Sequence, residues 1–142
     1  MTPGLRAFEG DWRVARVIRH AQWPDARFDG AARFLPDGTG LLYIEEGRLR
    51  IDGRAPMRAE RRYLWRAGAS GTIEVLFEDG RAFHRIAPGA EAPEDRHDCP
   101  PDIYDVTYDF RRWPEWRCVW RVRGPEKDYR MESLYRRADM PG

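Results

Sequence analysis

Residues 104–111 read YDVTYDFR, and along them large apolar side chains alternate with charged or polar ones. Residues 116–123 (WRCVWRVR) repeat this period of two, and residues 61–66 and 72–78 follow it with Leu76 as the exception. Successive side chains of a β-strand point to opposite faces of the sheet, so the alternation predicts strands with one buried and one solvated face. The chain is therefore expected to fold mainly as β-sheet.

Turn signals separate the alternating segments at hairpin spacing, and most of them are Asp-Gly pairs. Glycine accepts the positive φ that tight hairpin turns require. The signals lie at residues 29–30, 37–38, 52–53, 68–71, 79–80 and 124–125. With these turns as boundaries we expect nine strands, followed by a last strand at residues 128–136. The nine strands are expected at residues 12–19, 28–35, 40–46, 48–51, 58–66, 72–78, 82–87, 104–112 and 116–123.

The strand pattern also indicates how the sheet closes. Helix is a minor component, limited to a short opening helix over residues 2–9 that is capped by Thr2, with Pro3 following. A long meander must remove its edges, and short sequential hairpins favour an up-and-down barrel. We predict an all-β fold, an antiparallel up-and-down β-barrel of about 8–10 strands, as a single domain over residues 1–142. The connection 88–102 is expected to cross a barrel mouth.

Composition limits the classes of partner. A net charge of +1 with 35% charged residues describes a solvated surface whose signs cancel, so charge indicates neither nucleic acid nor an anionic membrane as a partner. The chain has no run of apolar residues long enough for a transmembrane helix and no signal-peptide pattern, so we expect a cytoplasmic protein. Cys99 and Cys118 are then expected to be thiols.

Phe8-Glu9-Gly10-Asp11-Trp12, which leads into the first predicted strand, resembles the Gly-x-Trp signature of lipocalins and other calycins. In those proteins the tryptophan closes one end of the barrel and packs against an arginine of the final strand. The resemblance therefore implies such a contact for Trp12, with Arg130, Arg136 or Arg137 as its partner.

A closer resemblance extends over nearly the whole chain. Its motifs are Phe8 to Trp12, Asp79-Gly80-Arg81-Ala82-Phe83-His84, His97-Asp98-Cys99-Pro100-Pro101-Asp102-Ile103-Tyr104 and Gly124-Pro125-Glu126-Lys127-Asp128-Tyr129. In this order they are similar to the uncharacterised, calycin-like family listed as domain of unknown function 6314. The resemblance implies a lipocalin-like barrel and no particular activity.

An aromatic interior is the first candidate binding feature. If the large residues point inward, the barrel is lined by Tyr104, Tyr108, Trp116, Cys118, Trp120, Tyr129, Met131 and Tyr135. Buried phenols and indoles need hydrogen-bond partners, so such a lining suggests water or a polar ligand group, while packed side chains are the alternative.

The second candidate feature is a cluster of reactive side chains. His97 and Cys99 project to the same side of an extended segment, because Pro100 disfavours helix in the residue before it. Three functional roles are possible for this cluster. They are thiolate-imidazole catalysis, haem binding by His84, and metal ligation by His84, His97, Cys99 and Asp102. The alternative is a purely structural role, in which the histidines hydrogen-bond to nearby groups and fix the connection 88–102. No spacing fixes a metal site, and the cofactor is unknown.

Lys127 is the only lysine of the chain and lies in the turn 124–129. If that turn and the connection 88–102 share one mouth, Lys127, His97 and Asp102 form a polar rim over the aromatic interior. Tryptophans near two hairpin ends, Trp23 and Trp113, are either partner surfaces or end plugs.

The leading functional prediction is an intracellular barrel that binds a small, partly apolar ligand. The predicted ligand-binding residues are His84, His97, Cys99, Asp102, Tyr104, Tyr108, Trp116, Trp120, Lys127 and Tyr129. One alternative is an enzyme that uses the His84, His97 and Asp102 cluster for acid-base chemistry, and another is a haem- or metal-binding barrel. A third is an oligomer-forming module without a ligand, for which a homodimer is the simplest form.

Overall fold

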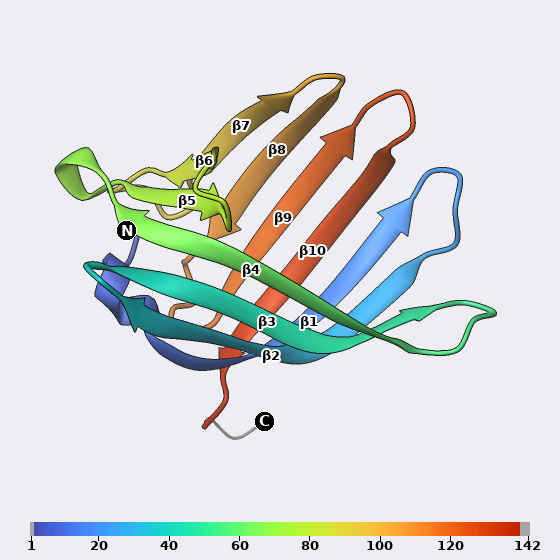
Figure 1. Cartoon of the computed structure of the whole chain (residues 1–142), viewed down its shortest axis with the longest axis horizontal. Coiled ribbons are helices and arrows are strands. Elements are labelled where there is room, and N and C mark those ends of the chain that lie inside the picture. Colours follow the sequence, from blue (N-terminus) through green and yellow to red (C-terminus); the bar gives the residue numbers. More distant parts are fainter. Residues whose placement is uncertain (1, 140–142) are drawn as a thin grey trace.

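Ten antiparallel strands form one sheet in the computed structural model, which describes residues 2–139 (Figure 1). The order of strands across the sheet is β6-β5-β4-β3-β2-β1-β10-β9-β8-β7. The strands are β1 (Gly10–His20), β2 (Ala26–Asp37), β3 (Gly40–Ile51), β4 (Met57–Ala67), β5 (Ile73–Phe77), β6 (Ala82–Ile86), β7 (Glu94–Cys99), β8 (Asp102–Asp109), β9 (Trp116–Arg123) and β10 (Asp128–Arg137). The fold is thus all-β, as the alternation predicted.

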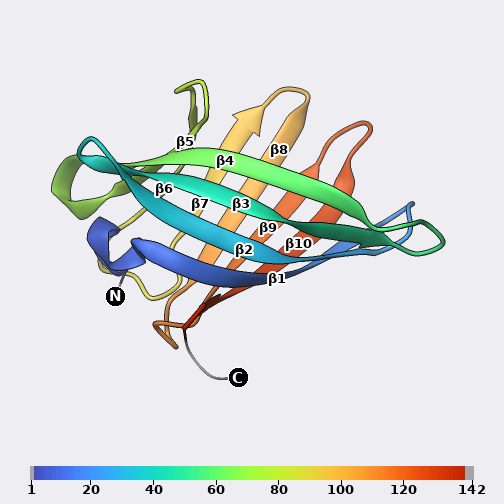
Figure 2. The ribbon, with the colours of Figure 1, turned by 60° about the horizontal axis from the view of Figure 1, so that its bottom comes forward.

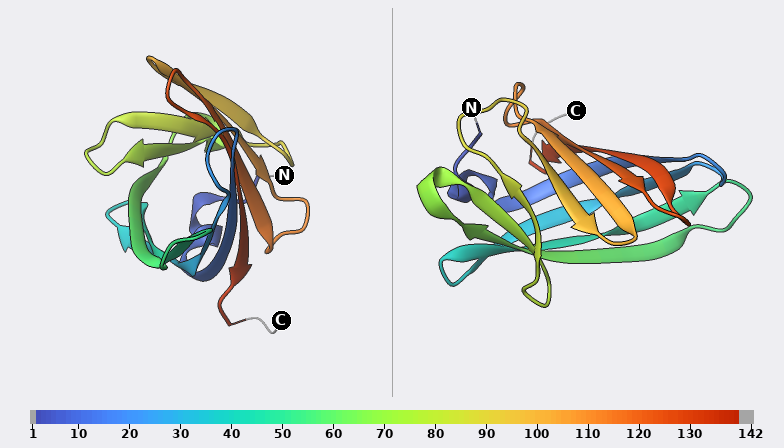
Figure 3. Two further views of the ribbon diagram at one scale, coloured as in Figure 1. Left: turned by 90° about the vertical axis from the view of Figure 1, so that its right-hand side faces the viewer. Right: turned by 90° about the horizontal axis from the view of Figure 1, so that it is seen from above.

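The sheet curls into a nearly closed barrel, in which β1 and β10 pair with each other in the middle of the strand order (Figure 3, left). Strands β6 and β7 are then the two edges, and side chains connect them in place of a backbone ladder. The backbone N–H of Arg85 donates to Asp95 Oδ2 at 2.7 Å, and the rings of Phe83 and His97 lie 5.3 Å apart. The barrel therefore has one seam, between β6 and β7.

The two ends of the barrel differ. At one end lie η1 (Leu5–Phe8), a 3₁₀-helix, and the segments 38–39, 68–72, 87–93 and 110–115 (Figure 2). The opposite end, called the mouth below, is formed by the hairpin turns 21–25, 52–56, 78–81, 100–101 and 124–127. Since every strand runs from one end to the other, side chains near the strand ends fall into these two groups.

Aromatic side chains plug the end that carries η1. Phe8 and Trp12 are both fully buried, and the ring of Trp113 lies 5.0 Å from that of Phe8 and 5.6 Å from that of Trp12. The Arg137 guanidinium lies 4.0 Å from the Trp12 ring and donates to the carbonyls of Ala7 and Glu9. Arg137 of the last strand is therefore the arginine that packs on Trp12, and Trp113 is a plug residue.

The opening helix is shorter than expected. Residues 5–8 form a 3₁₀ turn that begins after Gly4, whereas a helix over residues 2–9 was predicted. Thr2 does not cap it, because its hydroxyl hydrogen-bonds to the carbonyls of Ala87 and Ala90. The other described helix, η2 (Ala69–Gly71), is a single turn. Over residues 2–139, no helix has the length and apolar character needed to cross a membrane.

Two predicted boundaries were wrong. The predicted strands 40–46 and 48–51 are one strand, β3, and the predicted turn at 29–30 lies inside β2. Gly30 and Gly47 face each other across these strands, and a Cβ atom at either would collide with a backbone carbonyl of the paired strand and with the Phe28 ring. Glycine is needed here for close packing rather than for a turn.

The connection 88–102 is not a loop throughout. It contains β7, whose sequence EDRHDC is polar and which pairs with β8 in register His97↔Tyr104. Exposed charges are common on edge strands, where they oppose pairing with other chains. Residues 87–93 before β7 are irregular and lie at the plugged end, and only the short turn 100–101 after it lies at the mouth, so the connection does not cross the mouth.

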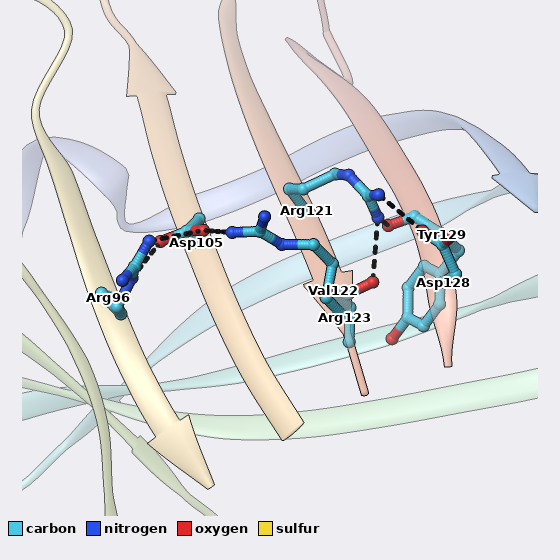
Figure 4. A network of polar contacts seen from close by, with 7 residues as sticks. All are labelled: Arg96, Asp105, Arg121, Val122, Arg123, Asp128 and Tyr129. Atoms are coloured by element: carbon cyan, nitrogen blue, oxygen red, sulfur yellow. Dashed lines mark hydrogen bonds and ion pairs between the residues drawn. The ribbon is translucent and has the colours of Figure 1, made fainter. Parts of the chain in front are cut away.

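Ion pairs on the outer face hold the strands next to the seam (Figure 4). Asp105 of β8 lies between Arg96 of β7, at 2.7 Å, and Arg123 of β9, at 3.1 Å. Arg121 pairs with Asp128 of β10 and donates to a backbone carbonyl of the same strand. These charges therefore pair with one another on the outer face of the barrel.

Candidate functional site

A small hollow lies inside the barrel. The space open to the centre of a water molecule is about 30 Å³, which is room for about two waters. Aromatic side chains make up half of its lining, and inward-facing residues of all strands except β2 and β7 contribute. The lining residues are Arg16, Tyr43, Glu45, Arg61, Tyr63, Trp65, Val75, Phe83, His84, Tyr108, Trp116, Cys118, Trp120, Met131, Ser133 and Tyr135.

One side of the hollow is a buried ion pair, between Arg16 of β1 and Glu45 of β3. Two guanidinium nitrogens of Arg16 donate to the two carboxylate oxygens of Glu45 at 2.6 and 2.7 Å. The Nε of Arg16 donates to Ser133 Oγ at 2.7 Å, and Tyr43 donates to Glu45 at 2.5 Å. The hydroxyls of Tyr43 and Tyr135 are 2.8 Å apart. We call these five residues the Arg16 network.

The Arg16 network carries no net charge. Burial raises the pKa of the Glu45 carboxyl, but the hydrogen bonds and charge of Arg16 outweigh burial, and the pKa is below its ordinary value. Burial lowers the pKa of Arg16, and the bonds to Glu45 more than reverse this, so both groups are ionised. Burial also raises the pKa of Tyr43 well above its ordinary value, so its hydroxyl remains a donor. The network is a satisfied set of donors and acceptors.

Sequence reasoning missed Arg16 and Glu45. Both occupy inward positions of their strands, Arg16 following Trp12 and Val14, and Glu45 following Tyr43. A charged residue on the apolar side of an alternating strand was the available signal, because charged residues are rarely buried without a partner.

Outside the Arg16 network, not all polar groups of the hollow have hydrogen-bond partners. His84 Nε2 lies 2.8 Å from the Tyr108 hydroxyl, whereas His84 Nδ1 and the Nε1 of Trp116 are buried without a hydrogen-bond partner. Burial, helped by the charge of His97, lowers the pKa of His84 to about 3, so its imidazole is neutral at pH 7. The Trp116 ring stacks on Tyr135 with centroids 3.8 Å apart.

At the mouth, the structure places Lys127 beside Asp102 and Tyr104. The Lys127 ammonium lies 2.9 Å from Asp102 Oδ2 and donates to the Tyr104 hydroxyl at 3.3 Å. These bonds, first the one to Asp102, raise the pKa of Lys127 above its ordinary value. The Asp102 carboxylate lies against Gly124, where a Cβ atom would collide with it. The His97 ring is 6.0 Å from that of Tyr104, so the three predicted rim residues lie together with Tyr104 in one cluster, called the rim cluster below.

Other predicted site residues lie apart. Cys99 is exposed and makes no hydrogen bond to His97, and Tyr129 packs on His20 with ring centroids 5.5 Å apart rather than lining the hollow. Tyr104 also lies outside the hollow lining, whereas Tyr108, Trp116, Cys118, Trp120, Met131 and Tyr135 belong to it.

The reactive side chains do not form a connected catalytic or metal-binding unit. No hydrogen bond or ion pair of the described part of the chain joins His84, His97 and Asp102 to one another. Within residues 2–139, no group of three His, Cys, Asp or Glu side chains is placed to hold a metal ion. Both Cys99 and Cys118 are free thiols, and burial raises the pKa of Cys118 to about 12. Cys118 is therefore a neutral lining residue.

The nearly closed barrel, with Trp12 and Arg137 at its plugged end, defines a protein of calycin-like fold. The model of the family of unknown function DUF6314 matches residues 8–137, and the chain belongs to this family. No curated protein matches the chain.

Among solved structures, the fold is similar to that of the S-type phycobiliprotein lyase from Guillardia theta. The TM-score is 0.53 at 10% sequence identity, and the match covers 98% of this chain and 95% of the lyase chain. At this identity the likeness concerns the barrel architecture, which the two proteins share over nearly their whole lengths.

Proposed function

We propose that the barrel binds a small, partly apolar molecule in its interior, with an acyl or ring-bearing body among the aromatic side chains. The observation that carries this proposal is the pair of buried polar atoms without partners, Trp116 Nε1 and His84 Nδ1, in residues that line the hollow. Buried polar groups in folded proteins are nearly always hydrogen-bonded, and an unmet one costs about 1–3 kcal/mol. A ligand that supplies the partner recovers this free energy.

The hollow as it stands is too small for a ligand of this size, so binding requires side chains to move. Arg61, Tyr63 and Trp120 are partly exposed lining residues and are the ones free to swing aside. The Phe83 ring packs edge-on against Trp120 at 5.1 Å, which places the seam strand β6 next to this group. Displaced water and the newly buried apolar surface both favour the bound state.

Two further features support a binding interior. The rim cluster sets charged and phenolic groups at the mouth, where they would orient a polar end of the molecule. A barrel of similar architecture is a phycobiliprotein lyase, so this fold serves proteins that have an activity of their own. Aromatic affinity inside and polar orientation at the mouth form the proposed mode of binding.

The test is native mass spectrometry of the chain purified gently from its own host, with identification of any retained molecule. The wild-type protein is expected to retain a bound molecule whose mass is that of a drug-sized ligand, the size that fills such sites. Cys118→Val adds side-chain volume inside the hollow and should lower the retained fraction severalfold. Cys99→Val makes the same chemical change at an exposed position and serves as the matched control.

Retention of the same molecule by Cys118→Val and Cys99→Val at equal occupancy would place it outside the hollow and refute the proposal. A wild-type protein that carries nothing, and that gains nothing on incubation with a host small-molecule extract, would do so as well. Circular dichroism of each variant shows that loss of the molecule is not loss of the fold.

A further inference from the structure

Arg61 of β4 differs from the other charged residues of the interior because it has no carboxylate partner. Its strand register places it directly opposite Glu45, yet both Glu45 oxygens are already bonded to Arg16. No carboxylate of residues 2–139 lies within ion-pair distance of the Arg61 guanidinium, which instead lies 5.4 Å from the centre of the Trp120 ring. The side chain is partly exposed and lines the hollow.

The charges that face the hollow therefore do not cancel. Arg16 and Glu45 form a neutral pair, and the imidazole of His84 is uncharged at pH 7. Arg61 remains as a single positive charge in the lining. The next residue, Arg62, shows the usual arrangement, because it points outward and pairs with Glu60 at 2.9 Å.

One unmet hydrogen-bonding group of the lining has the same preference as the charge, because it can bind only an acceptor. The indole Nε1 of Trp116 can only donate, and it is buried without an acceptor. The Arg61 guanidinium likewise offers several N–H donors in a planar fork, which suits a carboxylate or phosphate group. The Tyr63 hydroxyl, also in the lining, accepts a hydrogen bond from Arg61 and stays protonated, because burial raises its pKa above the ordinary value. The interior thus has an indole donor without an acceptor and a positive charge without a carboxylate.

We infer that the molecule bound in the barrel is an anion, an acyl or aromatic body that carries one carboxylate or a similar acid group, and that Arg61 binds this group. This inference rests on the proposed function and specifies its ligand class. The acid group takes the place of the missing partner of Arg61, while the apolar body lies along Trp120 and the aromatic lining. Arg61 is then the residue that selects acids over neutral molecules of the same shape.

The experiment compares two probes of equal shape, 1-naphthoate and its neutral amide, 1-naphthamide. Each is titrated into ¹⁵N-labelled full-length protein, and backbone and indole N–H shifts give both dissociation constants at pH 7.4. The wild type is expected to bind 1-naphthoate about tenfold more tightly than 1-naphthamide, the ratio that one partly buried charge pair supplies. The Trp116 indole N–H is expected to shift with the acid.

Three variants locate the selectivity. Arg61→Gln should bring the ratio of the two dissociation constants close to one, mainly by weakening 1-naphthoate, whereas Arg61→Lys keeps the charge and most of the ratio. Arg62→Gln removes an outward arginine of the same strand and should leave the ratio as in the wild type. Dispersed spectra of all three confirm that each is folded.

The outcomes separate this inference from the proposed function. If neither probe shifts residues of the hollow, the proposed binding interior itself fails. If both probes bind there with equal affinity, or if Arg61→Gln keeps the preference for the acid, the interior binds small molecules but the anion assignment is overturned. Loss of the preference in Arg61→Gln alone supports both.

Discussion

Replacement of Glu45 by leucine should be among the most destabilising single changes in the chain. Arg16 is 5% exposed and Glu45 1% exposed, and the pair is joined by two short hydrogen bonds of 2.6 and 2.7 Å. Glu45→Leu leaves the Arg16 charge inside the barrel with Ser133 Oγ as its nearest remaining acceptor. Breaking one side of a buried ion pair in this way costs about 3–5 kcal/mol.

Removal of both partners should cost less than removal of either. In Arg16→Met/Glu45→Leu neither member of the ion pair is left without the other, and two apolar side chains of similar length fill the space. Buried ion pairs replaced by well-packed apolar residues are often neutral in stability, so we expect the double variant to be more stable than both single variants. The coupling energy in a double-mutant cycle should therefore be at least about 3 kcal/mol.

Urea unfolding followed by tryptophan fluorescence measures each corner of this cycle, and a constant slope against urea checks that the comparison is valid. The loss expected for Glu45→Leu is a large part of the 5–15 kcal/mol that is typical of a whole domain, so the experiment is best run at low temperature. Single variants that each cost less than about 1 kcal/mol, or costs that simply add, would show that Arg16 and Glu45 do not form the buried pair described.

Three further predictions concern separate parts of the barrel. The pKa of His84 is about 3 in the folded chain against an ordinary 6.5, so the unfolded chain binds protons more readily between these pH values. The free energy of unfolding should therefore fall as the pH drops below 6.5, and it should fall more steeply in the wild type than in His84→Leu, by up to about 1.4 kcal/mol per pH unit. Urea unfolding from pH 7 to 4 measures this difference. Arg137→Met removes the contact over Trp12 and two bonds to backbone carbonyls and should cost about 1–2 kcal/mol in thermal unfolding, while Arg130→Met should cost little. Lys127 is 44% exposed, so Lys127→Met should change stability by less than about 1 kcal/mol, and a larger loss in urea unfolding would mean that the rim cluster is a folding element.

Most strands could be predicted because period-two alternation reports burial directly. The hairpin turns at Gly38, Gly53 and Gly80 were also readable, since all three glycines adopt positive φ. Gly30 and Gly47 gave the wrong boundaries, because a glycine that makes room for the paired backbone and the Phe28 ring looks the same in sequence as one that makes a turn. Which of the two roles a glycine has depends on its cross-strand neighbour.

Strand β7 shows a different limit. Residues 94–99 lack the apolar half of the alternation because one edge of the strand lies at the seam and much of it is exposed. Its position is fixed instead by pairing with β8 and by the surface bonds of Asp105 to Arg96. Contacts of this kind join residues from two strands, and no local pattern contains them.

The aromatic part of the candidate site was predictable and its charged part was not. Tyr108, Trp116 and Trp120 line the hollow because the alternation that predicted their strands also predicted their face. The partners of Arg16 are far away along the chain, on β3 and β10, and become neighbours only when the sheet closes. The lack of a carboxylate partner for Arg61 could likewise be seen only in the structure, where Arg16 binds both carboxylate oxygens of Glu45.

The most direct test of the account is a crystal structure of the protein purified from its own host without denaturation. The account predicts density for a bound molecule inside the barrel, with an acceptor atom at hydrogen-bond distance from Trp116 Nε1, an acid group on Arg61, and the Trp120 side chain moved from its present position. A structure whose interior holds only water, with the same packed side chains and any retained molecule on the outer face, would contradict it.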